Sequence, residues 1–372
     1  MARALSLVGD GVGNVALVIY VQRTRGTGTA VGLLLFVAAL PRLLSPLAGT
    51  VADRFDRRTV LVGGELAQAA IVGVVVLWLP PLPALLGLLL AKATFVTVAE
   101  PAGHSAVPDL VEDAHLVRAN VWVGGLRQAG EVLGPLVGGL LVALGGVRAG
   151  LGFDGATFLV SVPLLLRLPP LPPTGHDGPA GVGASAAEGL RYTLREPLVR
   201  GLTVAFLLVG LAAADDVALP FLARVLGAGD RGIGVLYAAV GAGLIVGYAA
   251  LSRGLRSRFA IGVLVASAGN ALTGIAPAIA VAVVCQMVRG VGLAVTETTL
   301  QTSIQRSVPS ELRGRVFANV YGAVNVGACI ALLAGGPLLD ATSARFVLVA
   351  CGAIGLLGAA FGARLGGPAP SR

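Results

Sequence analysis

Charged side chains interrupt several long apolar stretches of this sequence, and they are the residues best able to do chemistry there. A charge inside a bilayer costs roughly 2.5 to 3.5 kcal/mol on insertion scales, so each one needs a partner or a polar cavity. Four are basic and six are acidic: Asp10, Arg42, Lys92, Glu100, Arg127, Glu131, Asp215, Asp216, Arg289 and Glu297. Because acids outnumber bases, some carboxylates should be left over. A buried carboxylate without a cation is suited to taking up and releasing protons.

Two of the cations precede an acid on the same apolar stretch. Lys92 is followed eight residues later by Glu100, and Arg289 is followed at the same distance by Glu297. In an α-helix eight residues turn the chain about 80° from the starting face and advance it about 12 Å. Neither cation is therefore paired with that acid, and its partner must come from another segment.

Three further acids are candidates for such partners. Asp10 stands among glycines in Gly9-Asp-Gly-Val-Gly13, whereas Asp215 and Asp216 are adjacent. Neighbouring carboxylates on a helix point about 100° apart, so at most one of this pair should face a polar cavity, and we favour Asp215. The other interpretation is that the pair lies at the outer aqueous edge of the bilayer and is solvated.

The apolar stretches that must position these charges are long enough to be membrane helices. A span needs about 20 mostly apolar residues, and by that rule the sequence has twelve: 4–22, 30–49, 59–79, 82–104, 119–144, 149–168, 200–222, 231–252, 259–276, 278–303, 316–338 and 345–364. An even number places both termini on one side. With this topology 17 basic residues lie on that side, six lie opposite and four lie within spans. We therefore expect both termini in the cytoplasm.

The composition is that of a multi-pass membrane protein. Of the 372 residues, 56% are hydrophobic and 12% are charged, whereas soluble domains are about a quarter charged. The net charge of +8 comes from arginines in short loops, which argues against a nucleic-acid partner. The three cysteines and three histidines lack metal-ligand spacing, and the sequence has no phosphate-binding loop. We expect no metal, no cofactor and no enzymatic activity.

The largest break in the apolar pattern, Arg167–Arg200, is rich in proline and glycine. It predicts two six-helix bundles, at 1–168 and 200–372, joined by a cytoplasmic linker at 169–199. Within the linker, the basic segment Glu188–Arg195 can form an amphipathic helix on the membrane surface.

An internal repeat supports this division. Lys92 and Glu100 recur as Arg289 and Glu297 with an offset of 197, and an Ala-Asn-Val run recurs with an offset of 199. Duplicated halves of this kind are typical of secondary transporters.

The loop from Gly49 to Arg58 is densely charged and separates two apolar stretches. Gly49 permits close approach of the flanking helices, and Asp53 is placed to meet the positive end of a helix. The arginines must stay on one side of the bilayer. The loop has a glycine, then any three residues, then Asp-Arg and a basic pair. This pattern resembles the loop between helices 2 and 3 of the major facilitator superfamily of secondary transporters.

That resemblance implies a cytoplasmic gate made by five residues: Gly49, Asp53, Arg54, Arg57 and Arg58. In the closed state Asp53 would meet the N-terminal end of helix 11, near Arg315 and Val316. Arg57 would pair with an acid near the end of helix 4, for which there are three candidates: Glu100, Asp109 and Glu112. The alternative is that these charges only orient the protein in the membrane.

The fifth expected span carries glycines at four-residue spacing, which predicts a groove where another helix packs closely. With the following proline and glycine the pattern resembles the signature of the antiporter branch of the superfamily: Gly130, Gly134, Pro135, Gly138 and Gly139. It departs at its start, where Val121 replaces a glycine. In the same span Arg127 and Glu131 are four residues apart and can neutralise each other, which we favour over a proton site there.

The resemblance implies an all-α integral membrane fold of twelve transmembrane helices, in two pseudo-symmetric six-helix bundles that rock about a central cavity. Spans 4 and 10, which carry Lys92 and Arg289, line that cavity in the superfamily. The two cations then either face the cavity, attracting an anionic substrate or neutralising carboxylates, or form fixed salt bridges with one of three acids: Asp10, Asp215 and Asp216.

We expect proton-driven export of a small amphipathic compound, such as a drug, a macrolide-like metabolite or a siderophore, across a bacterial inner membrane. Lys92 and Arg289 would set the charge preference, and one of three acids would exchange protons: Asp10, Asp215 or Glu297. The expected partners are the small molecule, protons and the lipid bilayer, and the expected state is a monomer. The alternatives are a symporter or uptake permease of the same fold, a non-transporting receptor or assembly factor and, formally, a lipid-acting enzyme.

Overall fold

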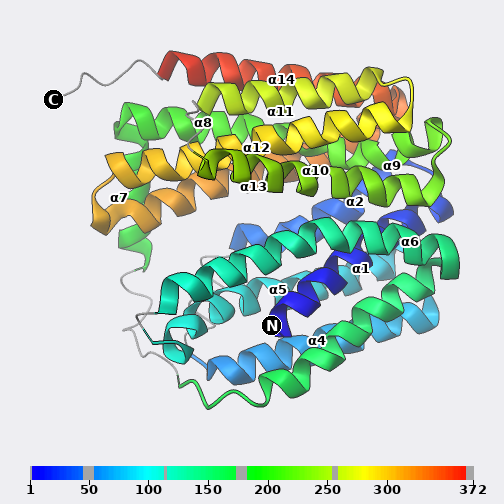
Figure 1. Cartoon of the computed structure of the whole chain (residues 1–372), viewed down its shortest axis with the longest axis horizontal. Helices are drawn as coiled ribbons and strands as arrows, with labels where there is room; N and C mark the ends of the chain where they lie inside the picture. Colours follow the sequence, from blue (N-terminus) through cyan, green and yellow to red (C-terminus); the bar gives the residue numbers. More distant parts are fainter. Residues whose placement is uncertain (1, 45–53, 113–114, 173–181, 254–258, 366–372) are drawn as a thin grey trace. The chain divides into compact units, whose positions relative to one another are not determined.

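The computed structural model describes the chain except for residues 1, 45–53, 113–114, 173–181, 254–258 and 366–372 (Figure 1). The described residues are almost entirely helical and contain no strand. In chain order the α-helices are α1 (Ala2–Arg25), α2 (Gly28–Ala39), α4 (Arg57–Trp78), α5 (Leu82–Leu110), α6 (Leu116–Leu165), α7 (Val182–Arg195), α8 (Pro197–Leu211), α9 (Asp215–Val225), α10 (Gly229–Ser252), α11 (Phe259–Ile275), α12 (Ile279–Ser307), α13 (Ser310–Ala341) and α14 (Ala344–Leu365). Two 3-10 helices continue α2 and link α8 to α9: η1 (Leu40–Leu44) and η3 (Ala212–Ala214).

The helices agree with the twelve expected spans. Within the described residues, eight stretches are long and apolar enough to cross a membrane, and three shorter apolar helices lie at Gly28–Leu44, Phe259–Ile275 and Ala344–Ala360. The longest stretch, Trp122–Leu165, is two spans, because Gly146 in the left-handed region (φ 77°) breaks α6 there. Glycine adopts this conformation without strain, which permits the sharp turn. The expected all-α, twelve-span fold is confirmed.

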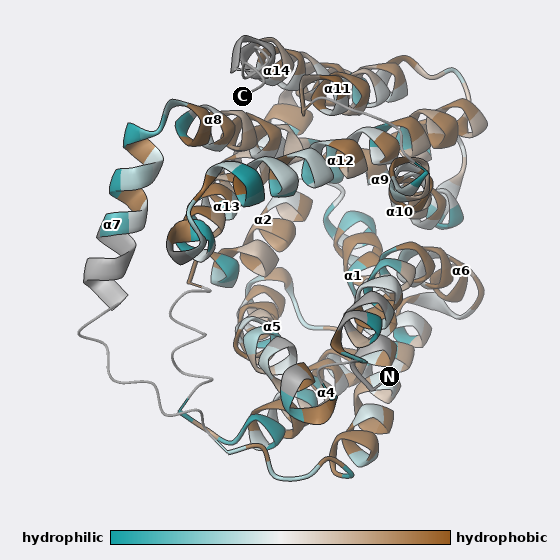
Figure 2. Cartoon of the chain, turned by 60° about the vertical axis from the view of Figure 1, so that its left-hand side comes forward, coloured by the Kyte–Doolittle hydropathy of each residue, from teal (hydrophilic) through white to brown (hydrophobic). Residues whose placement is uncertain are grey.

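The chain forms two compact units. Unit 1 comprises Met1–Asp177 with Ala228–Ala238, and unit 2 comprises Gly178–Gly227 with Ala239–Arg372. Unit 1 therefore holds α1 to α6 and the start of α10, whereas unit 2 holds α7 to α9, the rest of α10 and α11 to α14. The helices of both units are largely hydrophobic (Figure 2). The domain boundaries expected at 168 and 200 stay a prediction.

Each unit contains an apolar cluster of its own. In unit 1, Leu61 of α4 and Leu165 of α6 pack with two alanines of α5. In unit 2, Phe206 of α8 stacks on Phe259 of α11 with ring centroids 5.8 Å apart, and Tyr321 of α13 meets Phe206 edge-on. These clusters bring helices that are distant in the sequence together.

Helix α7 contains the amphipathic segment expected at 188–195 and begins earlier. It packs on α13 within unit 2, where Glu188 forms an ion pair with Arg315 and the Asn319 amide donates to Thr193 Oγ1 at 3.0 Å. Helix α13 begins at Ser310, a few residues before Arg315 and Val316, near which the N-terminal end of helix 11 was expected. An apolar run marks only the part of a helix in hydrocarbon, and this helix continues into polar sequence.

Helix α4 begins with a side-chain cap. Asp56 Oδ1 accepts a hydrogen bond from the Thr59 N–H at 2.8 Å, and Oδ2 accepts one from the Leu171 N–H at 2.7 Å. Burial raises the pKa of this carboxyl, but the hydrogen bonds and the Arg58 charge outweigh it, so the pKa lies below its usual range. Asp56 thereby ties the start of α4 to the segment that follows α6.

Candidate functional site

Unit 1 contains a buried cluster of three charged side chains. Lys92 Nζ, on α5, lies 2.8 Å from Asp154 Oδ2 on α6 and 2.9 Å from Asp10 Oδ1 on α1. Lys92 also lies over the Phe158 ring, 5.1 Å from its centroid, where the ring face favours a cation. The Asp154 side chain is fully buried, whereas that of Asp10 is 22% exposed. One cation is thus shared by two carboxylates.

The glycines around Asp10 make room for this cluster. A Cβ atom on Gly13 would lie 2.2 Å from Asp154 Oδ2, and a Cβ atom on Gly9 would lie 1.9 Å from Thr157 Oγ1 and 3.1 Å from Asp154 Oδ1. Any side chain at either position would collide with these polar groups. The two glycines, one helical turn apart, therefore let α1 approach α6 closely enough for both aspartates to reach Lys92.

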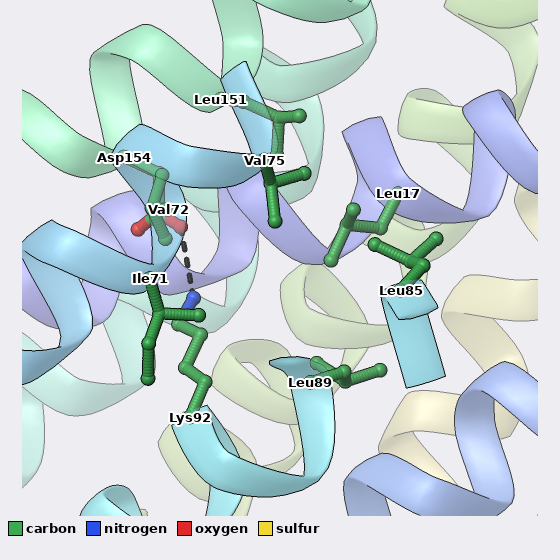
Figure 3. A pocket seen from close by; sticks show the side chains of 9 residues that line it. All are labelled: Leu17, Ile71, Val72, Val75, Leu85, Leu89, Lys92, Leu151 and Asp154. Atoms are coloured by element: carbon green, nitrogen blue, oxygen red, sulfur yellow. Dashed lines mark hydrogen bonds and ion pairs between the residues drawn. The ribbon is translucent and has the colours of Figure 1, made fainter. Parts of the chain in front are cut away.

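A small pocket adjoins Lys92 and Asp154, and Figure 3 shows the ion pair at its wall. Apart from these two residues its lining is aliphatic: Leu17, Ile71, Val72, Val75, Leu85, Leu89 and Leu151. Its empty volume is about 270 Å³, part of which is open to solvent.

A second polar group lies in unit 1 between α1, α4 and α6. Ser6 Oγ is 2.9 Å from both carboxylate oxygens of the buried Glu65 and 3.0 Å from Ser161 Oγ. Ser161 in turn donates to the Thr157 carbonyl. Buried acids satisfied by hydroxyl groups are a stable arrangement because the carboxylate oxygens have donors.

The set of ten charges expected from the sequence was incomplete, because it omitted Glu65 and Asp154. Both stand inside apolar helices, α4 and α6. Each has small residues beside it, as in Gly63-Gly64-Glu65 and in Asp154-Gly155. An acid next to glycine within an apolar run was the signal that could have identified them.

The corresponding cluster in unit 2 contains one fully buried acid. Arg289 Nη2, on α12, lies 2.5 Å from Asp215 Oδ2, and Asn270 of α11 donates to the same oxygen at 2.8 Å. Asp215 Oδ1 accepts from the Asp216 N–H at 2.9 Å. Of the adjacent acids, Asp215 is fully buried, which excludes a solvated position for it, and the expectation that it faces a cavity stays a prediction. Gln286 contacts both Arg289 and Asn270.

The acids eight residues beyond the two cations have other partners, as the helical geometry requires. Glu297 accepts hydrogen bonds from Tyr248 Oη at 2.8 Å and from Gln301. Glu100 lies 2.9 Å from Arg127, which is 3.7 Å from Glu131. The expected Arg127–Glu131 pair is therefore present, but the shorter contact of Arg127 is with Glu100.

The charged loop is described from Arg54 onward, so Gly49 and Asp53 lie outside the described residues. Arg57 is buried and forms an ion pair with Asp109 near the end of α5, one of the three acids expected. Arg58 donates to the Leu166 carbonyl at 2.6 Å, and Arg54 is exposed. The basic pair thus ties the start of α4 to the ends of α5 and α6.

The glycines of the fifth span form close contacts with α1. A Cβ atom on Gly134 would lie 2.7 Å from Gly11 Cα, and one on Gly138 would lie 3.0 Å from Val12 Cα. Gly130 faces Leu7 in the same way, and the expected small-residue groove is therefore occupied by α1. Gly139 meets Gly234 in the part of α10 that belongs to unit 1, and Pro135 lies inside α6, where a Cβ atom on Gly11 would be 3.3 Å from its Cδ atom.

Comparison with known proteins identifies the class. The sequence profile of the Major Facilitator Superfamily matches residues 1–318. The chain belongs to this superfamily and is a multi-pass membrane transporter of small molecules. It is 30% identical over 379 residues to the Enterobactin exporter EntS of Shigella boydii serotype 18 and to that of Escherichia coli O139:H28, with 96% of this chain and 90% of each relative covered.

Solved structures share the fold. A bacterial homologue of the iron transporter ferroportin in an inward-facing state has a TM-score of 0.73 at 20% identity and covers 98% of this chain and 96% of its own. A bacterial homologue of the lysosomal transporter Spinster has a TM-score of 0.77 at 16% identity with the same coverage. The nucleoside transporter NupG has a TM-score of 0.79 at 11% identity, covering 98% and 97%.

Proposed function

We propose that this transporter exports a small amphipathic compound, in the first place a siderophore, across the inner membrane of a bacterium in exchange for protons. The observation that carries the proposal is the 30% identity, over 96% of the chain, to proteins named as enterobactin exporters. The excess of arginines on the side of the termini supports a cytoplasmic location for both termini. The transporter acts as a monomer of two six-helix bundles, 1–168 and 200–372, joined by the linker 169–199.

The buried charges supply the means of coupling. Each unit buries one cation of its fourth or tenth span beside an acid, Lys92 beside Asp10 and Arg289 beside Asp215. A cation released from its acid can attract an anionic substrate, and an acid released from its cation can take up a proton. Lys92 and Arg289 then set the charge preference, and three acids are the candidate proton carriers: Asp10, Asp215 and Glu297.

The charged loop is the proposed cytoplasmic gate. Its residues are Gly49, Asp53, Arg54, Arg57 and Arg58. The ion pair of Arg57 with Asp109 supports a fixed position for the second half of this loop. The glycine motif of the fifth span, packed on α1 at Gly134 and Gly138, supports export because it resembles the antiporter signature.

Substrate-driven proton movement in inside-out membrane vesicles tests the proposal. A proton gradient is imposed, a pH-sensitive dye reports it, and enterobactin and a panel of cationic, neutral and anionic amphipathic compounds are added one at a time. At least one compound should discharge the gradient with the native chain and not with Asp53→Asn. If none of the compounds makes the inserted and folded protein discharge the gradient, proton-coupled export is refuted, and uptake or a receptor role becomes the better account.

A further inference from the structure

The Asp154 carboxylate has an incomplete set of hydrogen bonds. Its Oδ2 atom is 2.8 Å from Lys92 Nζ, but for Oδ1 no donor lies within hydrogen-bond distance among the residues that the structure describes. The side chain is fully buried. An ionised oxygen buried without a donor is strongly disfavoured, whereas a protonated carboxyl is neutral.

The net charge of the cluster also favours a protonated carboxyl group. With Lys92, Asp10 and Asp154 all ionised, two negative charges share one positive charge. A surplus buried charge is costly, and binding one proton removes it. The charged groups that face Asp154 are Lys92 from α5 and Asp10 from α1, while α4 presents Ile71 and Val72 at this level.

Besides Arg57 and Arg58 at its start, α4 carries one charged residue, Glu65. Glu65 accepts a hydrogen bond from Ser6 Oγ, which also lies 3.0 Å from Ser161 Oγ, and Ser161 is two helical turns beyond Asp154 on α6. Because Glu65 is an acid, it brings no positive charge to the Lys92 cluster.

Exposure decides which of the two acids takes the proton. Asp10 is 22% exposed, so water can stabilise its charge, whereas Asp154 is fully buried. A carboxylate that keeps some water pays less for ionisation than one that has none. The free Oδ1 atom of Asp154 also faces the narrow gap beside Gly9, next to Thr157 Oγ1.

We infer that Asp154 is the member of this cluster that binds and releases the coupling proton, and that it does so at Oδ1. A proton from water forms an O–H bond with Oδ1, the charge of the cluster changes from −1 to 0, and release reverses the step. Asp10 stays ionised beside Lys92. The inference rests on the proposed function and names Asp154, in place of Asp10, as the proton carrier of unit 1.

Infrared spectroscopy of the purified full-length protein in liposomes tests the inference without a substrate. The carbonyl stretch of a protonated carboxylic acid is recorded from neutral to alkaline pH for the native chain, Asp154→Asn and Glu65→Gln. The native chain should show a protonated-acid band that falls at alkaline pH, and Asp154→Asn should lose it. Glu65→Gln, which alters another buried acid of unit 1, should keep it. A band retained in Asp154→Asn, or lost in Glu65→Gln alone, overturns the inference.

A second variant keeps the test decisive if Asp154→Asn does not fold. Asp10→Asn should weaken the band at neutral pH, because Asp154 alone then balances Lys92 and stays ionised. An unchanged band in Asp10→Asn overturns the inference. The vesicle assay is a separate readout. If no compound discharges the gradient although the infrared band is present, proton-coupled export is refuted, but proton binding by Asp154 is not.

Discussion

The buried cations of the two units stand at equivalent places in the repeated halves but in different surroundings. Lys92 of unit 1 is shared by Asp10 and Asp154, and one oxygen of Asp154 has no donor among the described residues. Arg289 of unit 2 pairs with Asp215, and both oxygens of that acid accept hydrogen bonds. The two clusters therefore differ in the donors that reach their buried acid.

This difference separates two uses of a buried ion pair. A saturated pair with amide donors holds its charge, because every oxygen has a partner in the ionised state. A pair with a surplus carboxylate has a neutral form available through protonation. On this account Asp154 of unit 1 is better suited than Asp215 of unit 2 to be the acid that changes its charge.

Removal of the shared cation should have the largest effect. Lys92→Met leaves Asp10 and Asp154 without their counter-ion and should lower the free energy of unfolding by about 3 to 5 kcal/mol. Arg289→Met should cost less, because Asp215 keeps the Asn270 amide and the Asp216 N–H. Thermal unfolding in detergent, followed by tryptophan fluorescence, compares the two. Equal losses, or a larger loss for Arg289→Met, would contradict the account.

Asn270, the amide donor to Asp215, can be replaced so that the unit 2 cluster becomes more like the unit 1 cluster. Asn270→Ala removes a hydrogen bond to a charged acceptor and should destabilise the protein by about 1.5 to 3 kcal/mol in the same unfolding assay. Asn270→Asp replaces the amide donor of Asp215 by a further carboxylate and should add a protonated-acid band to the infrared spectrum. Absence of that added band in a folded Asn270→Asp protein would show that surplus carboxylates alone do not create a proton site.

The glycines that flank the unit 1 cluster allow a matched pair of variants. Gly13→Ala places a methyl group 2.2 Å from Asp154 Oδ2 and should cost about 1 to 3 kcal/mol of stability. Gly63→Ala adds the same methyl group to α4, where nothing lies within 4 Å. It should be neutral or stabilise by up to about 1 kcal/mol. If the two variants unfold at the same temperature, the close packing of α1 on Asp154 is not as described.

The smallest expected effect concerns the cap of α4. Asp56→Ala should cost about 1 kcal/mol. Because folding lowers the pKa of Asp56, its ionised form stabilises the fold above the unfolded pKa, and this contribution is lost as the pH falls through the lowered folded pKa. The native chain should therefore lose stability in that acidic range relative to Asp56→Asn, measured by thermal unfolding at a series of pH values. An identical pH dependence in the two proteins would exclude this role.

The sequence predicted the fold because its signals are local. Twenty-residue apolar runs, arginine-rich loops and the repeat of Lys92 as Arg289 specify spans and halves. The sequence predicts separate spans at 119–144 and 149–168, and the structure joins them as one helix bent at Gly146. Helix ends were less predictable, as at α13, because helices continue beyond the hydrocarbon.

The candidate site was only partly predictable. Helical geometry required Lys92 and Arg289 to find partners on other helices, and Asp10 and Asp215 were among the acids considered. Asp154 was missed, although it stands next to a glycine in an apolar run, because the sequence does not show which helices bring Lys92 and Asp10 to it. Neither could the sequence show which oxygen of a carboxylate lacks a donor.

The most direct test of the central claim is the proton dependence of export in liposomes that contain the purified native chain or Asp154→Asn. The rate of export of a compound active in the vesicle panel is measured with and without an imposed proton gradient. The gradient should accelerate export by the native chain, whereas export by Asp154→Asn should proceed at the same rate in both conditions. Acceleration of Asp154→Asn to the native extent would contradict the claim that the unit 1 cluster carries the changing charge.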